Sequence, residues 1–556
     1  MTRTLGLALL GAMMVTAPAL NAQGFTRTDV TNNGTHLVLN GLVSVTDSME
    51  TDFEVVDIDL DGDIDVIVGR KTPFTTGQTG LPNLLLINDG AGHLTDMSAT
   101  LSTFNTNIDI AREVKCGDLN NDGWPDVVTF NTEDQATFIY YNLGNDLAGN
   151  WLGLGAPSFV QFGVDFSMCG GEILDYDVDG WMDLFRVDYQ SAHENDLLRQ
   201  NPAAPGTFID MTATILSAPN GAQCINTGFG TRAQAWDATT GAMLDVNLDG
   251  FVDLCTAESG GSQITFSDGA GGWIACQDTT SSSVYDAVHA DFDNDGRIDL
   301  LNVTDGLDDW RRNLSTNANG TVAYSGTEAI GFGSVSSGFG ANPHVSDFDG
   351  DGDLDVFVTP IDVDIPNCST RRLILYENKG PGVTPRFQEY LQGGANPMPQ
   401  GIYDLRTADF DGDGILDIIM TGCTTDPGFK YWVSDPNAMP NAFASDFIPQ
   451  ANGSKIFKVD NVPTNPGAAR LYNFFDLDAS APLGTGPFFG LSTSVLNQVG
   501  FGYPFVADLA PAQASFQFTI SAFAVQAIPV VRQRTAYVNF TTGQVELAPL
   551  IEETSN

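Results

Sequence analysis

DFDGDGILD, residues 409–417, is the last of seven acidic loops that follow one pattern along this chain. The pattern is Asp-x-Asp/Asn-x-Asp-Gly-x-x-Asp. Its copies begin at Asp57, Asp118, Asp175, Asp245, Asp291, Asp347 and Asp409. Consecutive copies start 46 to 70 residues apart. A unit that recurs at such a period predicts a repeat architecture.

Oxygen-bearing side chains alternate within each loop, at positions 1, 3, 5 and 9. Alternate residues of a tightly wound loop can point their oxygens at one centre, and Ca²⁺ takes about six to eight oxygens in a forgiving geometry. The glycine at position 6 allows the backbone to turn where a Cβ would clash. Position 7 varies in chemistry, which suits a ligand that offers only its backbone carbonyl. The loops therefore predict up to seven calcium ions.

The predicted ligands occupy positions 1, 3, 5, 7 and 9 of each loop. They are Asp57, Asp59, Asp61, Asp63, Asp65, Asp118, Asn120, Asp122, Trp124, Asp126, Asp175, Asp177, Asp179, Trp181, Asp183, Asp245, Asn247, Asp249, Phe251, Asp253, Asp291, Asp293, Asp295, Arg297, Asp299, Asp347, Asp349, Asp351, Asp353, Asp355, Asp409, Asp411, Asp413, Ile415 and Asp417. Because Asn120 and Asn247 replace Asp at position 3, we expect weaker binding in the second and fourth loops.

The sequence around the loops excludes an EF-hand. An EF-hand needs a bidentate Glu at position 12, and none of the seven loops has a Glu there. A β-prone run follows each loop, as in DVIVG after Ile64 and DVFVT after Leu354. Position 8 is apolar in every copy, which predicts that it anchors the loop to a core.

Each unit continues with a turn between two further β-prone runs, as in LLLINDGAGHLTD (84–96) and ITFSDGAGGWIAC (264–276). Four strands per unit, repeated seven times, predict an all-β fold with a seven-bladed β-propeller. The units resemble the FG-GAP/VCBS repeats of integrin α-chain propellers and of many secreted bacterial proteins. The resemblance covers roughly residues 24–450. It implies calcium between the first two strands of a blade and partner contacts on the opposite face.

The remaining segments predict the domain organisation. Residues 23–450 form the propeller, 451–461 a linker, 462–548 a small β-sandwich-like domain and 549–556 a flexible tail. Two segments compete to complete the last blade. GFTRTDVT (24–31) is favoured as the closing strand over AFASDFIPQ (442–450).

The net charge and the predicted localisation restrict the possible partners of the protein. The net charge of −47 disfavours nucleic acid and anionic membranes, because both need basic patches on the protein. Residues 1–22 have the basic, apolar and small-residue regions of a secretory signal peptide. No later apolar run reaches about 18 residues, so no membrane span is expected. A secreted protein is predicted, with its oligomeric state open.

No catalytic signature appears among the sequence motifs, and His289 and His344 are interpreted as structural. We therefore expect a non-enzymatic module that binds an extracellular protein or glycan. The alternative is a polysaccharide lyase or hydrolase built on the same scaffold. Residues 217–241, with Arg232 and Trp236, and residues 361–372 are the candidate contact loops.

Disulfides are expected between Cys169 and Cys224 and between Cys368 and Cys423.

Overall fold

The computed structural model is an all-β chain whose described residues fall in many short ranges. These are 27–31, 33–39, 49–73, 77–160, 168–188, 195–212, 230–235, 243–258, 261–280, 284–304, 308–326, 328–329, 342–348, 353–359, 373–380, 385–389, 399–412, 415–422, 428–434, 444–449, 455–460, 469–476, 506–509, 516–520, 530–539, 545–547 and 551–554.

The first four blades of the predicted propeller are antiparallel sheets whose strands follow one another in the chain. Blade 1 also carries β2 (Leu37–Val38), parallel to its outer strand. The strands of blades 1 to 4 are β3 (Glu50–Val56), β4 (Asp65–Arg70), β5 (Leu84–Ile87) and β6 (Leu94–Asp96); β7 (Ala111–Gly117), β8 (Asp126–Asn131), β9 (Thr137–Tyr140) and β10 (Ser158–Val160); β11 (Met168–Leu174), β12 (Asp183–Asp188), β13 (Asp196–Gln200) and β14 (Phe208–Asp210); and β15 (Gly230–Gln234), β16 (Leu254–Glu258), β17 (Gly261–Ser267) and β18 (Trp273–Thr280).

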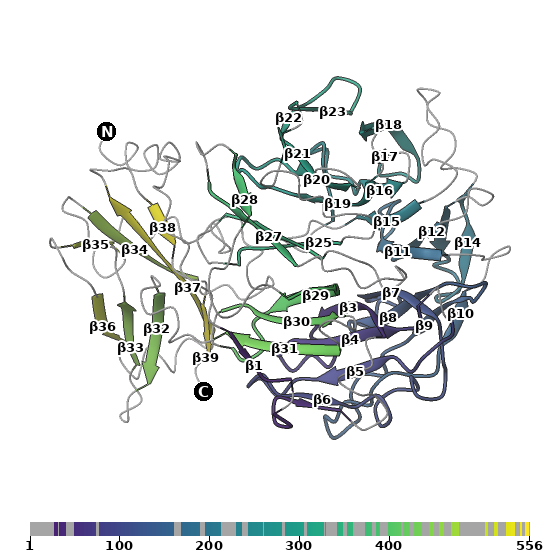
Figure 1. The fold of residues 1–556 in the computed structure, drawn as a ribbon, viewed down its shortest axis with the longest axis horizontal. Coiled ribbons are helices and arrows are strands. Elements are labelled where there is room, and N and C mark those ends of the chain that lie inside the picture. The colour runs from purple at the N-terminus through teal and green to yellow at the C-terminus, as the bar shows by residue number, and fades with distance from the viewer. Residues whose placement is uncertain are drawn as a thin grey trace.

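Blades 5 to 7 repeat the arrangement, and the short hairpin β22–β23, between β21 and β24 of blade 5 in the chain, forms a two-stranded sheet of its own. Their strands are β19 (Val284–Ala290), β20 (Asp299–Thr304), β21 (Asp309–Arg311), β22 (Asn313–Thr316), β23 (Val322–Tyr324) and β24 (Glu328–Ala329); β25 (Pro343–Ser346), β26 (Asp355–Val358), β27 (Ile374–Asn378) and β28 (Phe387–Glu389); and β29 (Ile402–Ala408), β30 (Asp417–Gly422) and β31 (Gly428–Ser434). The inner strands β3, β7, β11, β15, β19, β25 and β29 lie around the middle of the ring (Figure 1). The predicted seven-bladed β-propeller is confirmed.

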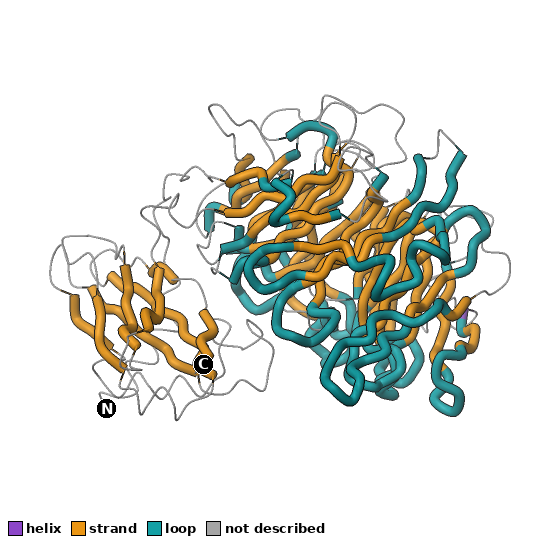
Figure 2. Tube along the Cα trace, turned by 90° about the horizontal axis from the view of Figure 1, so that it is seen from below, coloured by secondary structure: helices purple, strands orange, loops and turns teal. Residues whose placement is uncertain are grey.

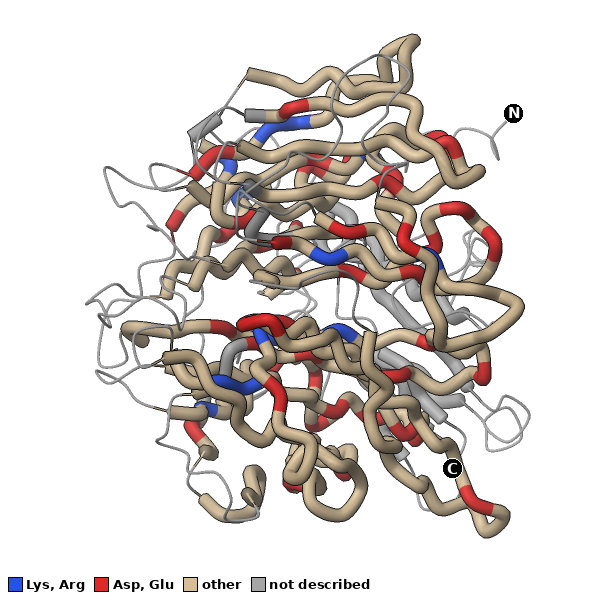
Figure 3. The backbone as a smooth tube through the Cα atoms, turned by 90° about the vertical axis from the view of Figure 1, so that its right-hand side faces the viewer, with Lys and Arg blue, Asp and Glu red and all other residues tan. Residues whose placement is uncertain are grey.

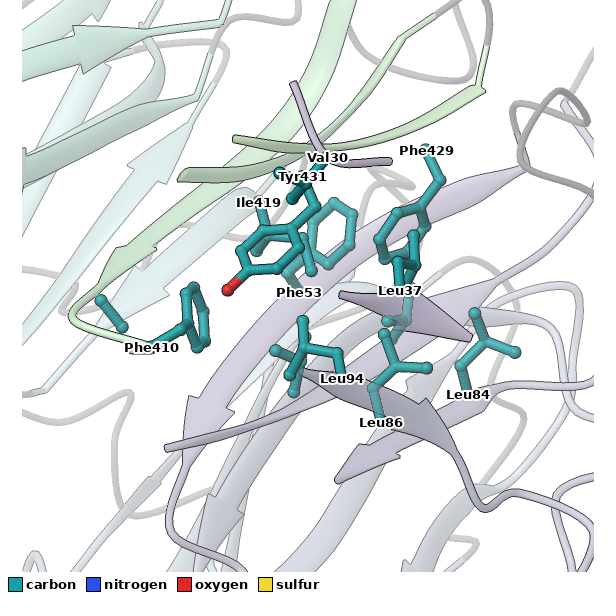
Figure 4. Close-up of a cluster of buried hydrophobic side chains, with 13 residues drawn as sticks. Val30, Leu37, Phe53, Leu84, Leu86, Leu94, Phe410, Ile419, Phe429 and Tyr431 are labelled. Atoms are coloured by element: carbon teal, nitrogen blue, oxygen red, sulfur yellow. The ribbon is translucent and has the colours of Figure 1, made fainter. Parts of the chain in front are cut away.

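The N-terminal strand closes the ring. β1 (Arg27–Asp29) pairs antiparallel with β31, as the outer strand of blade 7. Val30 and Leu37 then pack with Phe53 of blade 1 and with Phe410 and Tyr431 of blade 7 (Figure 4). This confirms the favoured closing segment.

A buried apolar cluster lies between each pair of neighbouring blades. The side chain at position 2 of the acidic loops belongs to these clusters, and Ile58 and Leu119 are fully buried. Position 8 is buried or half-buried, as predicted, for example at Val252 and Ile64. The loops are therefore anchored on both sides of their acidic segment.

The C-terminal part forms two further sheets, visible as a separate group of strands in Figure 2. The first contains β32 (Ala444–Pro449), β33 (Lys455–Asp460) and β36 (Phe516–Ile520). The second contains β35 (Val506–Leu509), β34 (Ala469–Asp476), β37 (Val530–Asn539), β38 (Val545–Leu547) and β39 (Ile551–Thr554).

Strand pairing in this part corrects two expected boundaries. β32 pairs with β33 and not with blade 7, so the propeller ends before Ala444. β33 fills most of the expected linker 451–461, and β39, inside the expected tail 549–556, pairs with β37. The sequence did not reveal the strand pairing that makes parts of 451–461 and 549–556 β-strands. The sandwich-like packing of the two sheets stays a prediction.

Candidate metal centres

The first five acidic loops are wound by hydrogen bonds to their first aspartate. In the first loop, the carboxylate of Asp57 accepts the N–H of Asp61 (3.0 Å) and of Gly62 (3.1 Å). Asp118, Asp175, Asp245 and Asp291 accept the same two bonds in their own loops. The winding is therefore a property of the repeated motif.

Winding brings the predicted ligands together in four loops. The carboxylates of three aspartates lie within 4.8 Å of one another in loops 1, 3, 5 and 7, counting loops from the N-terminus. These groups are Asp57, Asp59 and Asp61; Asp175, Asp177 and Asp183; Asp291, Asp293 and Asp295; and Asp409, Asp411 and Asp417. Asp349, Asp351 and Asp413 of loops 6 and 7 lie outside the described residues.

Unpartnered oxygens at position 3 test whether a cation fits. One carboxylate oxygen each of Asp59, Asp177 and Asp293 is buried and has no hydrogen-bond partner. Burial, together with the neighbouring Asp61, raises the pKa of Asp59 to about 6. A buried oxygen with this charge needs a partner. Oxygen ligands of this kind suit Ca²⁺, so the residues present fit the predicted ion.

Position 9 has a second task that the sequence did not predict. Asp65 is fully buried and accepts the N–H of Ile58 (3.1 Å) and of Asn88 (2.8 Å). Burial raises the pKa of Asp65 and of Asp183 to about 8 each. The position-9 carboxylate therefore fastens the loop to the turn after the third strand of its blade.

Loops 2 and 4 differ from the others at position 3, where Asn120 and Asn247 replace Asp. The Asn120 side-chain amide donates to Asp122 (2.9 Å), and that of Asn247 donates to Asp249 (3.0 Å). Each amide therefore occupies a carboxylate oxygen that would otherwise face a cation. Weaker calcium binding in these loops stays a prediction.

Loop 3 contains a counter-cation that the sequence did not reveal. Arg199, on β13 of the same blade, lies 2.7 Å from a carboxylate oxygen of Asp177 and 2.9 Å from one of Asp179. The acidic group of loop 3 contains positions 1, 3 and 9, whereas in loops 1 and 5 it contains positions 1, 3 and 5. The guanidinium thus binds the position-5 carboxylate.

A polar side chain near the end of the third strand joins each of the first six blades to the one before it. In six blades this side chain donates to the carbonyl at position 2 of the preceding loop, over 2.6 to 3.2 Å. The pairs are Asn88 with Phe410, Asn142 with Ile58, Gln200 with Leu119, Ser267 with Tyr176, Asn313 with Val246 and Asn378 with Phe292. The candidate metal loops are therefore also the joints of the ring.

Carboxylates on the inner strands form a second set of joints. Asp404 accepts the N–H of Phe53 (2.9 Å) and Asp52 that of Val114 (2.8 Å), each from the next blade. Arg406 pairs with Asp52 (3.2 Å) and Asp404 (3.1 Å). Burial would raise the pKa of Asp404, but Arg406 and the neighbouring histidine hold it well below its usual range.

The two histidines near the loops are packed into these inner strands. His344 lies 2.8 Å from Asp404, and buried His289 contacts Gln234 through Nδ1 (3.0 Å). Burial lowers the pKa of His289 to about 3. Both contacts fit the structural interpretation of these residues.

The cysteines overturn one expected disulfide. Cys116, Cys169 and Cys255 are thiols, so the expected Cys169–Cys224 bond is wrong. Cys169 lies at the irregularity between Met168 and Gly170 in the innermost strand of blade 3. Cys276 is disulfide-bonded, which the sequence did not predict. Cys368 and Cys423, like segment 361–372, Trp236 and most of segment 217–241, lie outside the described residues.

Two of the missed features had signals in the sequence. Position 2 is apolar in all seven loops, and an Asn, Gln or Ser stands at the end of the third strand or within two residues after it in every blade. Arg199 had no such signal, because its role depends on how β13 lies beside the loop. Among the described residues, no helix is long and apolar enough to cross a bilayer.

Comparison with known proteins identifies the repeat. The model of the FG-GAP-like repeat family matches residues 57–129, 291–358 and 347–420. Together with the seven blades, this makes the chain an FG-GAP repeat β-propeller protein. A comparison with curated proteins gives no match.

Three solved structures match this chain over much of its length. The first is an Agrocybe aegerita lectin that recognises non-reducing terminal N-acetylglucosamine, at 16% identity and a TM-score of 0.40, covering 68% of this chain and 87% of the lectin. The second is the V. cholerae biofilm matrix protein Bap1, at 12% identity and a TM-score of 0.38, covering 75% and 92%. The third is the Myceliophteria thermophila Cps50 (Swd1) β-propeller domain, at 8% identity and a TM-score of 0.36, covering 73% and 99%.

Proposed function

We propose that this chain is a secreted, calcium-stabilised β-propeller that binds an extracellular protein or glycan without transforming it. The supporting observation is the double set of joints between blades. Asn88 and its equivalents join six blades to their predecessors, and Asp404 and Asp52 join the inner strands of blades 7, 1 and 2. A ring joined in this way holds its connecting loops at constant positions, as a binding surface requires.

The calcium part of the proposal rests on position 3. Asp59, Asp177 and Asp293 each keep a buried carboxylate oxygen without a partner. In the proposed bound state, positions 1, 3 and 5 and the buried position 9 would hold the ion, which would supply the missing positive charge. The disulfide at Cys276 supports a place outside the cytosol, since disulfides persist in oxidising compartments.

A polysaccharide-acting enzyme is the competing function. Most glycoside hydrolases use a pair of carboxyl groups about 5 to 10 Å apart. The inner-strand carboxylates described here are instead engaged: Asp52 and Asp404 with Arg406, and Glu113 with Lys115 and the N–H of Gly171. This engagement favours binding over chemistry.

Binding and turnover can be measured on the same sample. Calcium-loaded protein is applied to an array of glycans and extracellular proteins. It is also incubated with acidic and neutral polysaccharides, which are assayed for new reducing ends and unsaturated products. We expect saturable binding to one ligand class, reduced by EDTA, with no product. Product formation above a heat-inactivated control would replace this proposal with the enzymatic one.

A further inference from the structure

Position 4 of the acidic loop has an unusual backbone conformation. Its φ is positive in every loop where it is described: Leu60 (55°), Asn121 (57°), Val178 (57°), Leu248 (61°), Asn294 (57°) and Gly412 (72°). This left-handed region is tolerated by Gly and Asn but is strained for Leu and especially for β-branched Val. Three loops therefore carry a residue that the backbone disfavours.

The asparagines show what this position does when it serves the fold. Asn121 donates its side-chain amide to the carbonyl of Gly180 in the next loop (2.8 Å). Asn294 donates to Asp353 of the next blade (2.7 Å). In blades 2 and 5, position 4 thus fits its conformation and also bonds to the neighbouring blade.

Leu60, Val178 and Leu248 lack both advantages. Their exposed fractions are 48%, 55% and 53%, so they contribute little to any described core. Each follows a predicted calcium ligand at position 3 and precedes another at position 5. Strain that gives no internal packing points to an external contact. All three belong to the same face, because the loop occupies the same place in every blade.

The charge around these side chains identifies the partner's chemistry. Asp57, Asp59, Asp61 and Asp63 flank Leu60 in the sequence, and one bound Ca²⁺ would leave this loop negative. Carboxylates flank Leu248 and Val178 in the same way, although at Val178 they pair with Arg199. Acidic residues also outnumber basic ones along the described chain (Figure 3). A second copy of the chain or an anionic lipid surface would be repelled. An apolar side chain framed by carboxylates fits an apolar contact that is flanked by Lys or Arg.

We propose that Leu60, Val178 and Leu248 form a docking surface for a cationic, amphipathic polypeptide on the calcium-loop face of the propeller. This surface lies on the face opposite to the one that the family resemblance implies. The inference rests on the proposed binding function and names the partner class for it. Apolar anchors at the three loops supply contact area, and the surrounding carboxylates supply orientation and selectivity.

The test uses asparagine, which blades 2 and 5 already accept at this position. The triple variant Leu60→Asn, Val178→Asn, Leu248→Asn is compared with the wild type in calcium-containing buffer. Calorimetry measures binding of a short amphipathic lysine–leucine peptide and of a lysine-only peptide with equal charge. Phosphatidylcholine vesicles and a neutral polysaccharide are the other probes, and melting temperature reports on the fold.

We expect the wild type to bind the lysine–leucine peptide more tightly than the lysine-only peptide. The triple variant should bind it about tenfold more weakly, at the level of the lysine-only peptide, because three apolar contacts are lost. Its melting temperature should be equal or higher, since Asn relieves the strain. Equal peptide binding by variant and wild type, or a lower melting temperature, would overturn the proposal. Loss of vesicle or polysaccharide binding alone would assign the surface to that other partner class. Polysaccharide turnover would contradict the proposed function and leave this surface to be judged by the peptide result.

Discussion

The side-chain amide of Asn88 donates to the carbonyl of Phe410, 2.8 Å away and 322 residues distant in sequence. The same amide donates to the carbonyl of Ile64 in its own blade (3.1 Å). Asn88 therefore joins the first and last blades at the level of their acidic loops. It acts together with β1 and the Val30 cluster, which close the same interface.

Replacing Asn88 with Ala should lower the free energy of unfolding by about 1–3 kcal/mol. The carbonyl of Ile64 loses a donor, and that of Phe410 keeps only the backbone N–H of Gly92. The cost of leaving a buried polar group without a partner exceeds the net value of the bond. Urea unfolding followed by tryptophan fluorescence measures the change. Asn150→Ala is the matched control, because Asn150 donates only to Asp146 at the surface. Equal effects of both changes would contradict the role assigned to Asn88.

Arg199→Gln should strengthen calcium binding at the third loop. The guanidinium holds Asp177 and Asp179, so calcium must compete with it, and glutamine removes that competing charge. Loss of about 1.4 kcal/mol of competition corresponds to a tenfold gain in affinity. Calcium titration calorimetry should show one more site, or one tighter site, than the wild type.

The control for this change is Arg297→Gln, which removes the same charge beside the fifth loop. Arg297 lies at position 7 of that loop and donates its backbone N–H to Asp295. This bond is independent of the side chain, so the control should leave the titration nearly unchanged. A similar gain in calcium affinity in both variants would contradict a specific role for Arg199, since loss of any nearby positive charge would then have the same effect.

Stability should depend on His289 at acidic pH. Its folded-state pKa of about 3 lies below its ordinary value, because burial disfavours the charged form. The unfolded chain therefore binds the proton first, and stability is lost as pH falls below about 6.5, by up to about 1.4 kcal/mol per pH unit.

His289→Gln isolates this contribution. The free energy of unfolding of wild type minus variant should be constant above neutral pH and should fall between pH values of about 6 and 4. Chemical unfolding at several pH values, with EDTA present throughout, excludes any change in metal occupancy. A difference that does not vary with pH would contradict the neutral, buried state of His289.

Positions 3 and 9 of one loop should respond differently to mutation. Asp59→Ala removes a carboxylate oxygen that has no protein partner, so without calcium it should leave stability equal or slightly higher. Asp65→Ala breaks the buried bonds to Ile58 and Asn88 and should cost about 1–3 kcal/mol even in EDTA. Melting curves of both variants with EDTA provide the comparison. Equal curves would contradict a separate structural task for Asp65.

The repeated loop predicted the fold because one motif specifies both a blade and a period. Asp57 and its equivalents mark the turn between the first two strands, and β1 was recognisable as a final strand from its similarity to residues 93–100. The predicted ligands are assembled in loops 1, 3, 5 and 7.

Features that depend on long-range placement were not predictable in this way. Arg199 reaches loop 3 only because β13 lies beside it, and Cys169 is fixed by a bulge in β11. The positive φ of Val178 could not be predicted, because position 4 of the motif varies in residue type between loops. β33, in the segment expected to be a linker, becomes a strand by pairing with β32 and with β36, which lies about 60 residues further along the chain.

Metal content and melting temperature, measured together, test the central claim that the acidic loops bind calcium and stabilise the ring. Without a cation, the carboxylates of each loop repel one another. A tenfold excess of calcium over Kd contributes about 1.4 kcal/mol per occupied loop. Elemental analysis should find several calcium ions per chain. EDTA should lower the melting temperature sharply, and calcium should restore it better than magnesium, which demands stricter geometry. A chain without calcium whose melting curve is unchanged by EDTA would contradict the account.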